Sequence, residues 1–385
     1  MKKQLLVLFL SVLTLVSCSD DNNNSSGEKT GTLTGKVTTI NTHKAVGGAL
    51  VFAFDDDHNI YHTYTNATGD FELDAPIGDR EVYIQTGDGS NFRTKIDVVV
   101  EENQTKQLEE SLLRLDQVAR IAYVSGNYDS IEDIITSLGY VAESITFSQL
   151  SDYNIVSEYD IIFLNCGSIS GGIWNNATVT TNLAKFVTNG GSLYASDWAV
   201  AYLIGGSRYS TMCGDAGGFI SDATLCSTNT GNMGTLNASI TNTALANAIG
   251  LSTLDIEYDL GSWQKIISVD ETFWEVLVRD STTNEALMIK TNSFFDSSLV
   301  GNPVGNPQNS DWITICHQPD ENSSTPITIT IDASSWPAHQ AHGDTLGSCT
   351  GTGTGGTIYY TTFHNHANEN IGNSQLILEH VILNL

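Results

Sequence analysis

The hydrophobic pattern of this 385-residue chain changes near residue 117, and the change limits the folds that are open to it. Before that point, short β-rich runs alternate with turn sequences, and no helical period competes with them. After it, apolar strands alternate with helix-like segments. The first pattern is typical of an antiparallel β-sandwich, and the second indicates an α/β unit with a parallel sheet covered on both faces. We therefore predict two folded units, residues 31–115 and residues 117–385.

The predicted elements follow from these patterns. In the first unit, the strands are residues 33–40, 49–54, 60–65, 70–74, 81–86 and 93–100. In the second, the strands are residues 118–124, 140–146, 159–165 and 192–195, and the helices are residues 128–138, 176–188 and 371–385. Ligands of parallel sheets bind outside the carboxyl ends of the strands. The segments that follow the strands, residues 125–127, 165–168 and 196–198, are therefore the first place to look for a site.

The first residues predict an exported protein. Residues 1–17 combine two lysines with a short apolar run, which is typical of a signal peptide and too short to span a bilayer. The run ends in LVSC, which resembles a bacterial lipobox with Cys18 as the lipidated residue; the alternative is an ordinary signal peptide with a chance cysteine. Residues 18–30 then form a lipid anchor and flexible tether. Their acidic start resembles the export signal of Bacteroidetes surface lipoproteins, so we expect a location on the outer membrane, exposed at the cell surface.

Charge narrows the possible partners. Asp and Glu outnumber Lys and Arg by 44 to 16, which gives a formal net charge of −28. Such a surface repels phosphate backbones, so we expect no nucleic-acid partner. No apolar segment after the signal is long enough to cross a membrane, and the expected membrane contact is the N-terminal lipid alone.

The cysteines divide by role. With Cys18 lipidated, five remain in an oxidising compartment, where pairing is expected. We predict the disulfides Cys213–Cys226 and Cys316–Cys349, although sequence alone leaves other connectivities open. Cys166 is then left over at a strand end. A nucleophilic thiol needs a base or a positive neighbourhood, and none is near in sequence, so we interpret Cys166 as buried and structural.

Residues 31–115 resemble a known accessory module. The sequences VGGALV at residues 46–51 and TNATGDFEL at residues 65–73 are similar to those of carboxypeptidase-regulatory-like (prealbumin-like) domains. This resemblance implies a seven-stranded spacer without chemistry of its own. His58 and His62 lie beside three aspartates, residues 55–57, so a calcium or transition-metal site is one interpretation and a solvated hairpin tip is the other. We favour the hairpin tip, because consecutive acidic residues usually form an exposed face.

The second unit resembles the class I glutamine-amidotransferase-like fold, a flavodoxin-like α/β arrangement. The matching sequences are YDIIFL at residues 159–164, FVTNGGSL at residues 186–193 and YTTFH at residues 360–364. In that family, the bend after the Gly-Gly turn carries a nucleophilic cysteine, and a later strand supplies a histidine and a glutamate. Here the bend has Asp197 and no cysteine, while the late strand keeps His364 and has His366 in place of the glutamate. Glutaminase chemistry is therefore not expected.

Three residues remain as catalytic candidates at this sheet end. A carboxylate, Asp197, and two imidazoles, His364 and His366, could form a metal site with an open position, or they could be the remnant of the family's active site. A serine hydrolase with Ser196 and His364 is a further alternative, but the flanks lack the Gly-x-Ser-x-Gly context of a nucleophile elbow. We favour a remnant or binding pocket.

Residues 291–356 form an insertion that fits no regular element of that fold. Within it, CHQP at residues 316–319, HQAHGD at residues 339–344 and Cys349 resemble a short module of exported bacterial proteins, for which we know of no activity. We predict a disulfide-closed lobe beside His364. Its candidate ligands for a divalent metal, zinc or calcium, are His317, His339, His342 and Asp344.

The predicted function is that of a surface lipoprotein that binds an extracellular ligand, a glycan or a protein, without catalysis. One alternative is a metal-dependent hydrolase that acts on an extracellular substrate. The other is a structural or adhesive envelope protein.

Overall fold

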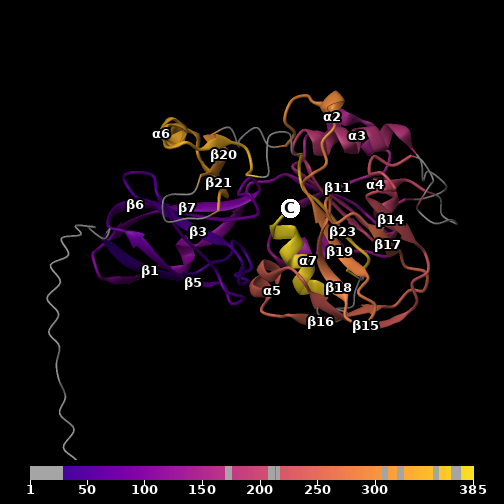
Figure 1. Ribbon diagram of the computed structural model, residues 1–385, viewed down its shortest axis with the longest axis horizontal. Helices are drawn as coiled ribbons and strands as arrows, with labels where there is room; N and C mark the ends of the chain where they lie inside the picture. Colours follow the sequence, from indigo (N-terminus) through magenta and orange to yellow (C-terminus); the bar gives the residue numbers. More distant parts are fainter. Residues whose placement is uncertain are drawn as a thin grey trace, which may run out of the picture.

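The computed structural model describes residues 29–169, 176–206, 213, 217–305, 311–318, 325–349, 355–365 and 374–385. The predicted signal peptide, Cys18 and His366 lie outside the described residues. The chain folds into several β-sheets with few helices, arranged as two units side by side (Figure 1). Among the described residues, no helix is long and apolar enough to span a bilayer.

The first unit consists of two sheets. One has the order β5-β1-β8 and the other the order β2-β9-β7-β6-β3-β4. Their bounds are β1 Thr30–Lys36, β2 Thr38–Thr39, β3 Leu50–Phe54, β4 Ile60–Tyr64, β5 Asp70–Pro76, β6 Gly78–Thr86, β7 Phe92–Val100, β8 Thr105–Gln107 and β9 Arg114–Gln117. The six predicted strands are present, whereas β8 and β9 were not predicted. The pairs β1–β8 and β2–β9 are parallel, so a purely antiparallel arrangement was wrong.

The two sheets share one apolar core. Alternate residues of β1 and β5 point inward, as their burial pattern shows, and Leu33 and Leu73 are buried there. Val51, Val82 and Ile84 of the second sheet belong to the same cluster. The alternation of buried and exposed residues is what a strand with one face on a core requires.

The second unit is built on a nine-stranded sheet of order β11-β10-β12-β13-β23-β19-β18-β15-β16. The strands are β10 Ile121–Val124, β11 Ala142–Ile145, β12 Ile161–Leu164, β13 Ser192–Ser196, β15 Gly234–Ile240, β16 Thr253–Tyr258, β18 Glu275–Asp280, β19 Ala286–Thr291 and β23 Ile358–Thr361. A separate pair is formed by β14 (Leu225–Thr228) and β17 (Lys265–Val269).

Only half of the large sheet is parallel. The strands β11, β10, β12, β13 and β23 run parallel to their neighbours, as predicted. From β19 onward each pairing is antiparallel, so the prediction of a parallel sheet was wrong for this half. The reason is local: β18 and β19 are joined by a short turn, and a connection of that length can join only antiparallel strands.

Short helices cover the sheet. They are α1 Ile131–Ser137, α2 Tyr153–Val156, α3 Ala177–Thr188, α4 Ala201–Ile204, α5 Thr243–Ile249 and α7 Ser374–Leu383. The longest, α3, begins at Asn176, whose side chain accepts bonds from the amides of Thr178 and Val179. Its Phe186 and Val187 are buried against the sheet.

In the described part of the insertion, three strands and one α-helix form a lobe: β20 Trp312–His317, β21 Ile327–Asp332, β22 Thr345–Leu346 and α6 Trp336–His342. Ile315, Ile329 and Ile331 of this lobe form a core with Phe52 and Tyr83 of the first unit. The lobe therefore packs on the first unit, above β6 and β7 in Figure 1, and the prediction that it lies beside His364 was wrong. Isoleucine and threonine alternate along β21, so its isoleucines lie on one face of the strand. That face packs against Phe52 and Tyr83 of the first unit.

The two units also contact each other directly. The rings of Phe92 and Tyr140 lie 4.9 Å apart, and the Asn91 side-chain amide donates to the carbonyl of Leu385 at 2.7 Å. Lys44 forms a 2.7 Å ion pair with Glu379 of α7. Buried residues of both units belong to a single apolar cluster.

Candidate functional site

The first candidate site lies at the carboxyl end of β13. The strand ends at Ser196, and the chain turns at once into a 3₁₀ helix, Asp197–Val200. Asp197 makes this turn with φ at +46°, a left-handed conformation that is uncommon for a residue other than glycine. The residue at the sharp bend is therefore a carboxylate, and it is 1 % exposed.

The Asp197 carboxylate lies among buried polar groups. Its Oδ1 accepts a 2.6 Å hydrogen bond from the backbone amide of Gln264, and its Oδ2 accepts a 3.4 Å hydrogen bond from the Cys166 thiol. His364 Nδ1 lies 3.8 Å from the same Oδ2. Ligand atoms of Cys166, Asp197 and His364 all lie within 4.8 Å of one another, so the group could hold a metal ion.

A second carboxylate, Asp129, lies next to this group. Ser196 Oγ donates to Asp129 Oδ2 and accepts a 2.9 Å bond from the Cys166 amide. The backbone amide of Asn365 donates to Asp129 Oδ1 at 3.1 Å. The Ser196 hydroxyl is thus committed to Asp129, so the structure does not support a Ser196–His364 nucleophile and base.

Burial determines the protonation of this site. It raises the pKa of Asp129 and of Asp197 to about 7, against the opposing effect of the hydrogen bonds that they accept. Burial, followed by the nearby Asp197, raises the pKa of the Cys166 thiol well above its usual range. Cys166 is buried and outside any disulfide, and such a thiol is a poor source of thiolate.

The structure brings together two of the three predicted catalytic candidates, Asp197 and His364. His366, the third, lies outside the described residues. Asp129 and Gln264 were missed. Asp129 follows a predicted strand by only five residues, at the start of the predicted helix 128–138, and this placement was the available signal; Gln264 comes from a distant segment with no signal of its own.

The second candidate site is in the lobe, where three histidines surround one carboxylate. Asp344 Oδ2 lies 2.9 Å from His317 Nδ1 and 2.7 Å from His339 Nδ1. Asp344 Oδ1 lies 3.4 Å from His342 Nδ1 and accepts a 2.8 Å hydrogen bond from the backbone amide of Gln318. All four predicted metal candidates therefore meet at one point, with the Asp344 side chain fully buried.

These contacts determine the charge of Asp344. Burial alone would raise its pKa, but the hydrogen bonds from His317, His339 and the Gln318 amide outweigh it and hold the pKa well below its usual range. The group is therefore a carboxylate at neutral pH. A single buried negative charge needs compensation from its neighbours.

The first unit borders this cluster, which the sequence did not predict. Phe54 lies 4.7 Å from the His339 ring, and His58 lies 5.2 Å from it, measured between centroids. Asp55 is 5 % exposed and accepts bonds from the amides of Asp57 and Asn59, so it shapes the hairpin between β3 and β4. The prediction of a solvated hairpin tip was wrong for Asp55, whose carboxylate is buried within the hairpin, and His58 is partly buried beside His339 of the lobe.

Two disulfides brace these regions, with the pairing that the sequence predicts. Cys213 is bonded to Cys226, and Cys316 is bonded to Cys349. The second bond closes the lobe next to His317. Its cysteines are therefore not thiolate ligands for a metal.

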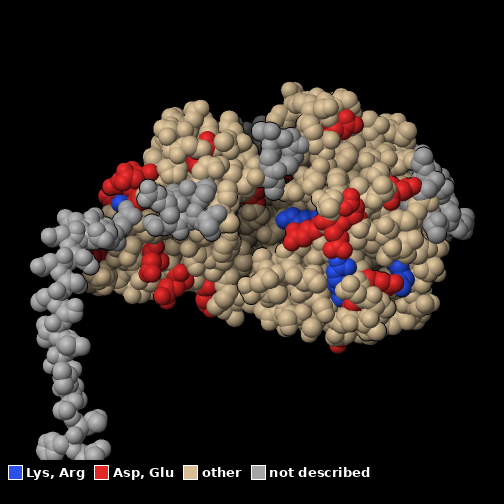
Figure 2. Space-filling model, viewed as in Figure 1, with Lys and Arg blue, Asp and Glu red and all other residues tan. Residues whose placement is uncertain are grey.

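Two neighbouring cavities lie between the units. They measure about 700 Å³ and 730 Å³ and share Gly87, Lys290, Thr328 and Asn384, which come from the first unit, the large sheet, the lobe and the end of the chain just after α7. Lys290 Nζ lies 5.3 Å from the centroid of the Tyr359 ring, and Tyr359 is the main cause that raises the pKa of Lys290. Figure 2 shows the surface hollowed between the two units.

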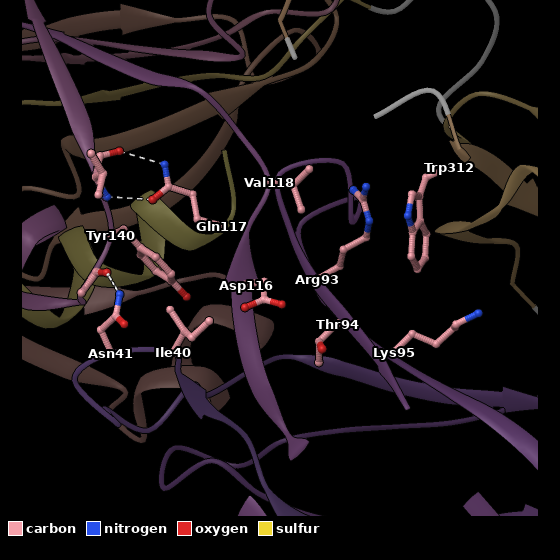
Figure 3. A pocket seen from close by; sticks show the side chains of 12 residues that line it. Ile40, Asn41, Arg93, Thr94, Lys95, Asp116, Gln117, Val118, Tyr140 and Trp312 are labelled. Atoms are coloured by element: carbon pink, nitrogen blue, oxygen red, sulfur yellow. Dashed lines mark hydrogen bonds between the residues drawn. The ribbon is translucent and has the colours of Figure 1, made fainter. Parts of the chain in front are cut away.

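A third cavity, of about 820 Å³, lies where the first unit, the second unit and the lobe meet (Figure 3). Arg93 stacks on the Trp312 ring at 4.4 Å, and Asp116 points into the space between Arg93 and Tyr140. The amides of Asn41 and Gln117 bond to the backbone of Gly139 and Val141 and so form part of the wall.

Comparison with known proteins gives limited similarity. No family model and no curated protein matches the sequence. The similar solved structures include a "putative carbohydrate binding protein" from Bacteroides uniformis, with 14% identity and a TM-score of 0.18 over 26% of this chain and 47% of that one. The 5-hydroxyisourate hydrolase of Klebsiella pneumoniae has 18% identity and a TM-score of 0.17 over 23% and 97%, respectively. A "putative thua-like protein" from B. uniformis has 11% identity and a TM-score of 0.28 over 44% and 75%. The chain spans about half the length of the first of these proteins, and none of the three similarities decides a function.

Proposed function

We propose that this protein is a lipid-anchored surface protein that binds an extracellular glycan between its two units, without amidotransferase chemistry. The observation that carries the proposal is the pair of neighbouring cavities around Lys290. Ligand sites occur preferentially where domains meet, and a few well-placed polar groups fix the ligand's orientation there.

The lining of these cavities fits a ligand rich in hydroxyl groups. Lys290 offers an ammonium group with three donors, and no carboxylate is hydrogen-bonded to it among the described residues. Thr86 Oγ1 is buried and has no hydrogen-bond partner in the described part of the chain, a deficit that a ligand hydroxyl would relieve. Asn384, His62 and Tyr64 add further polar groups and one aromatic ring.

The experiment is a binding screen of the purified protein against surface-exposed and extracellular polysaccharides, followed by calorimetry. We expect at least one glycan to bind, with an affinity that Lys290→Met lowers about tenfold, because one charge-assisted hydrogen bond contributes about 1.5–3 kcal/mol. Lys106→Met, an exposed lysine of β8, is the matched control and should bind as the unaltered protein does. Absence of any glycan ligand, or full affinity in Lys290→Met, would contradict the proposal.

The proposed architecture is a carboxypeptidase-regulatory-like sandwich that carries an amidotransferase-like domain above the membrane. The parallel order β11-β10-β12-β13-β23 and the sharp bend after β13 support the second assignment. At that bend the carboxylate of Asp197 replaces the thiol that amidotransferases use, which supports the absence of glutaminase activity. The anchor rests on Cys18, and loss of membrane partitioning in Cys18→Ala would test it.

A second candidate function is metal-dependent hydrolysis at Asp197. It is favoured by one observation, the approach of ligand atoms of Cys166, Asp197 and His364 to within 4.8 Å of one another. A divalent ion bound there would lower the pKa of a coordinated water and so supply a nucleophile. The test is hydrolase activity that a chelator removes and zinc restores. A protein in which His364→Ala leaves that activity intact would rule out this site.

A further inference from the structure

The lobe gathers four of the chain's nine histidines, three of its own and one from the first unit. They are His58, His317, His339 and His342. The His317 and His342 rings are stacked within 3° of parallel, with centroids 5.1 Å apart. Three of them, His317, His339 and His342, contact the buried Asp344 carboxylate, an arrangement that solvent exposure of polar side chains does not explain.

We propose that His317, His342 and Asp344 form a binding site for a transition-metal dication of the Zn²⁺ type, with His339 as a positioning residue for Asp344. This site is separate from Asp197 and goes beyond glycan binding. Its three ligand atoms all lie within 4.8 Å of one another. Three protein ligands leave one position of a tetrahedral ion open to water.

The distances fit such an ion without rearrangement of the backbone. Zinc–ligand bonds of about 2.0–2.1 Å place neighbouring ligand atoms about 3.3 Å apart in a tetrahedron. His317 Nδ1 lies 2.9 Å from Asp344 Oδ2, and His342 Nδ1 lies 3.4 Å from the other oxygen, Oδ1, so each imidazole faces one oxygen of the carboxylate. Without a metal, hydrogen bonds satisfy these contacts, and a bound ion would take their place.

The donor set selects the kind of metal. Two imidazoles and one carboxylate suit zinc and its first-row neighbours, whereas calcium takes six to eight oxygen ligands. The sulfur atoms of Cys316 and Cys349 are joined in a disulfide and supply no thiolate. The partners of the buried Asp344 carboxylate are three histidine side chains and one backbone amide, and a dication bound among them would compensate its negative charge.

His339 orients the carboxylate. Its Nδ1 lies 2.7 Å from Asp344 Oδ2, and its ring is 1 % exposed between Phe54 and Asp344. Groups in this role typically change metal affinity by about 10–100-fold. Because Phe54 and His58 of the first unit pack on His339, metal binding should also strengthen the attachment of the lobe to that unit.

The test is titration of the metal-stripped full chain, disulfides intact, with Zn²⁺ by calorimetry, and with Co²⁺ by visible absorption. We expect about one equivalent of Zn²⁺ to bind and to raise the melting temperature. His342→Gln should weaken binding by at least about tenfold; its side chain is 18 % exposed, so this variant should keep its fold, which circular dichroism verifies. His339→Gln should alter the spectrum of bound Co²⁺ as well as the affinity, a result that a purely structural role would not produce.

His43→Gln is the matched control, because His43 is exposed on the first unit and lies outside the cluster. It should bind Zn²⁺ as the unaltered protein does. The proposal is overturned if the folded protein takes up no stoichiometric Zn²⁺, or if folded His342→Gln and Asp344→Asn bind it undiminished. Glycan binding by Lys290 is measured separately, so either proposal can fail while the other stands.

Discussion

Asp197 and Asp129 are two residues that destabilise the fold locally, through backbone strain at Asp197 and through burial of both carboxyl groups. Asp197 takes a left-handed backbone conformation at the bend, and both carboxyl groups are about 1 % exposed. Burial raises the pKa of each to about 7, so ionisation at neutral pH opposes folding. Residues in such positions are typical of functional sites, where strain and altered acidity are retained.

The first prediction concerns the pH dependence of stability. The folded-state pKa of Asp129 is raised above its unfolded value, so the stability it contributes is present at low pH and declines as pH rises between about 4 and 7. Asp129→Asn cannot ionise and lacks this decline. The free energy of unfolding of the variant should therefore rise relative to that of the unaltered protein between about pH 4 and pH 7, and the difference should stay constant above that range. The upper limit is about 1.4 kcal/mol for each unit by which the pKa is raised.

Chemical denaturation at several pH values measures this difference. Asp133→Asn, on the exposed side of α1, is the control and should follow the unaltered protein at every pH. Parallel curves for Asp129→Asn and the unaltered protein would show that Asp129 is ionised at little cost.

For single residues, the sequence predicted which side chains belong to the candidate sites better than it predicted which residues they contact. The four lobe candidates and the pair Asp197 and His364 do meet, because strand ends and a disulfide bring them together. The contacts of Asp129 and Gln264 were beyond prediction, since each joins segments that lie far apart in the chain, although the position of Asp129 after a predicted strand was a signal. His58 was assigned to solvent, because nothing in its own neighbourhood signals that His339 of the lobe lies beside it.

Among the elements, the lobe depends most on covalent support. Its three strands are short, and its apolar residues complete a core only with those of the first unit. Sheets of this size are marginal on their own. The Cys316–Cys349 bond, which spans 33 residues, therefore contributes a large share of its stability.

The second prediction is that Cys316→Ser with Cys349→Ser loosens the lobe selectively. Loss of the loop closure should cost about 4 kcal/mol on a chain-entropy estimate. Hydrogen exchange should accelerate across β20, β21 and α6 and stay unchanged in β15 and β16. Cys213→Ser with Cys226→Ser is the matched control and should leave exchange in the lobe unaltered. Unchanged protection of the lobe in the first variant would mean that its apolar contacts suffice.

Prediction of the elements themselves depended on how local their signals are. The strands of the first unit are short β-rich runs between turn sequences, and β1 and β5 also alternate buried and less buried residues, so all six predicted strands were found within a few residues of their bounds. The parallel half of the large sheet was found from its apolar runs and the Gly-Gly turn. The antiparallel half was missed, because its strands were not recognised in the sequence, and the short turn between β18 and β19 could therefore not be used as a sign of antiparallel pairing.

At the scale of the whole molecule, the described residues form three buried apolar clusters, and one of them spans both units. Residues of the first unit, the large sheet and α7 belong to the same buried cluster, so the domain boundary near residue 117 in the sequence is not a boundary in the packing. Tyr140 is central to this continuity. It contacts the Phe92 ring, and its hydroxyl donates to the Leu115 carbonyl at 3.1 Å. We infer that the two units unfold together, although each has its own sheets.

The last prediction tests this coupling. Tyr140→Ala removes a buried ring from the junction and should cost about 3–5 kcal/mol, as large-to-small core changes of aromatic residues do. Because the loss falls between the units, calorimetry should show one transition in the unaltered protein and two in the variant. Tyr258→Ala is the matched control: this buried tyrosine stacks on Trp263 within the second unit, so its loss should lower the melting temperature without splitting the transition. A single transition in Tyr140→Ala would mean that the remaining contacts, such as that of Asn91 with Leu385, are enough to couple the units. The cavity around Lys290, which lies between the units, would then keep its shape in that variant.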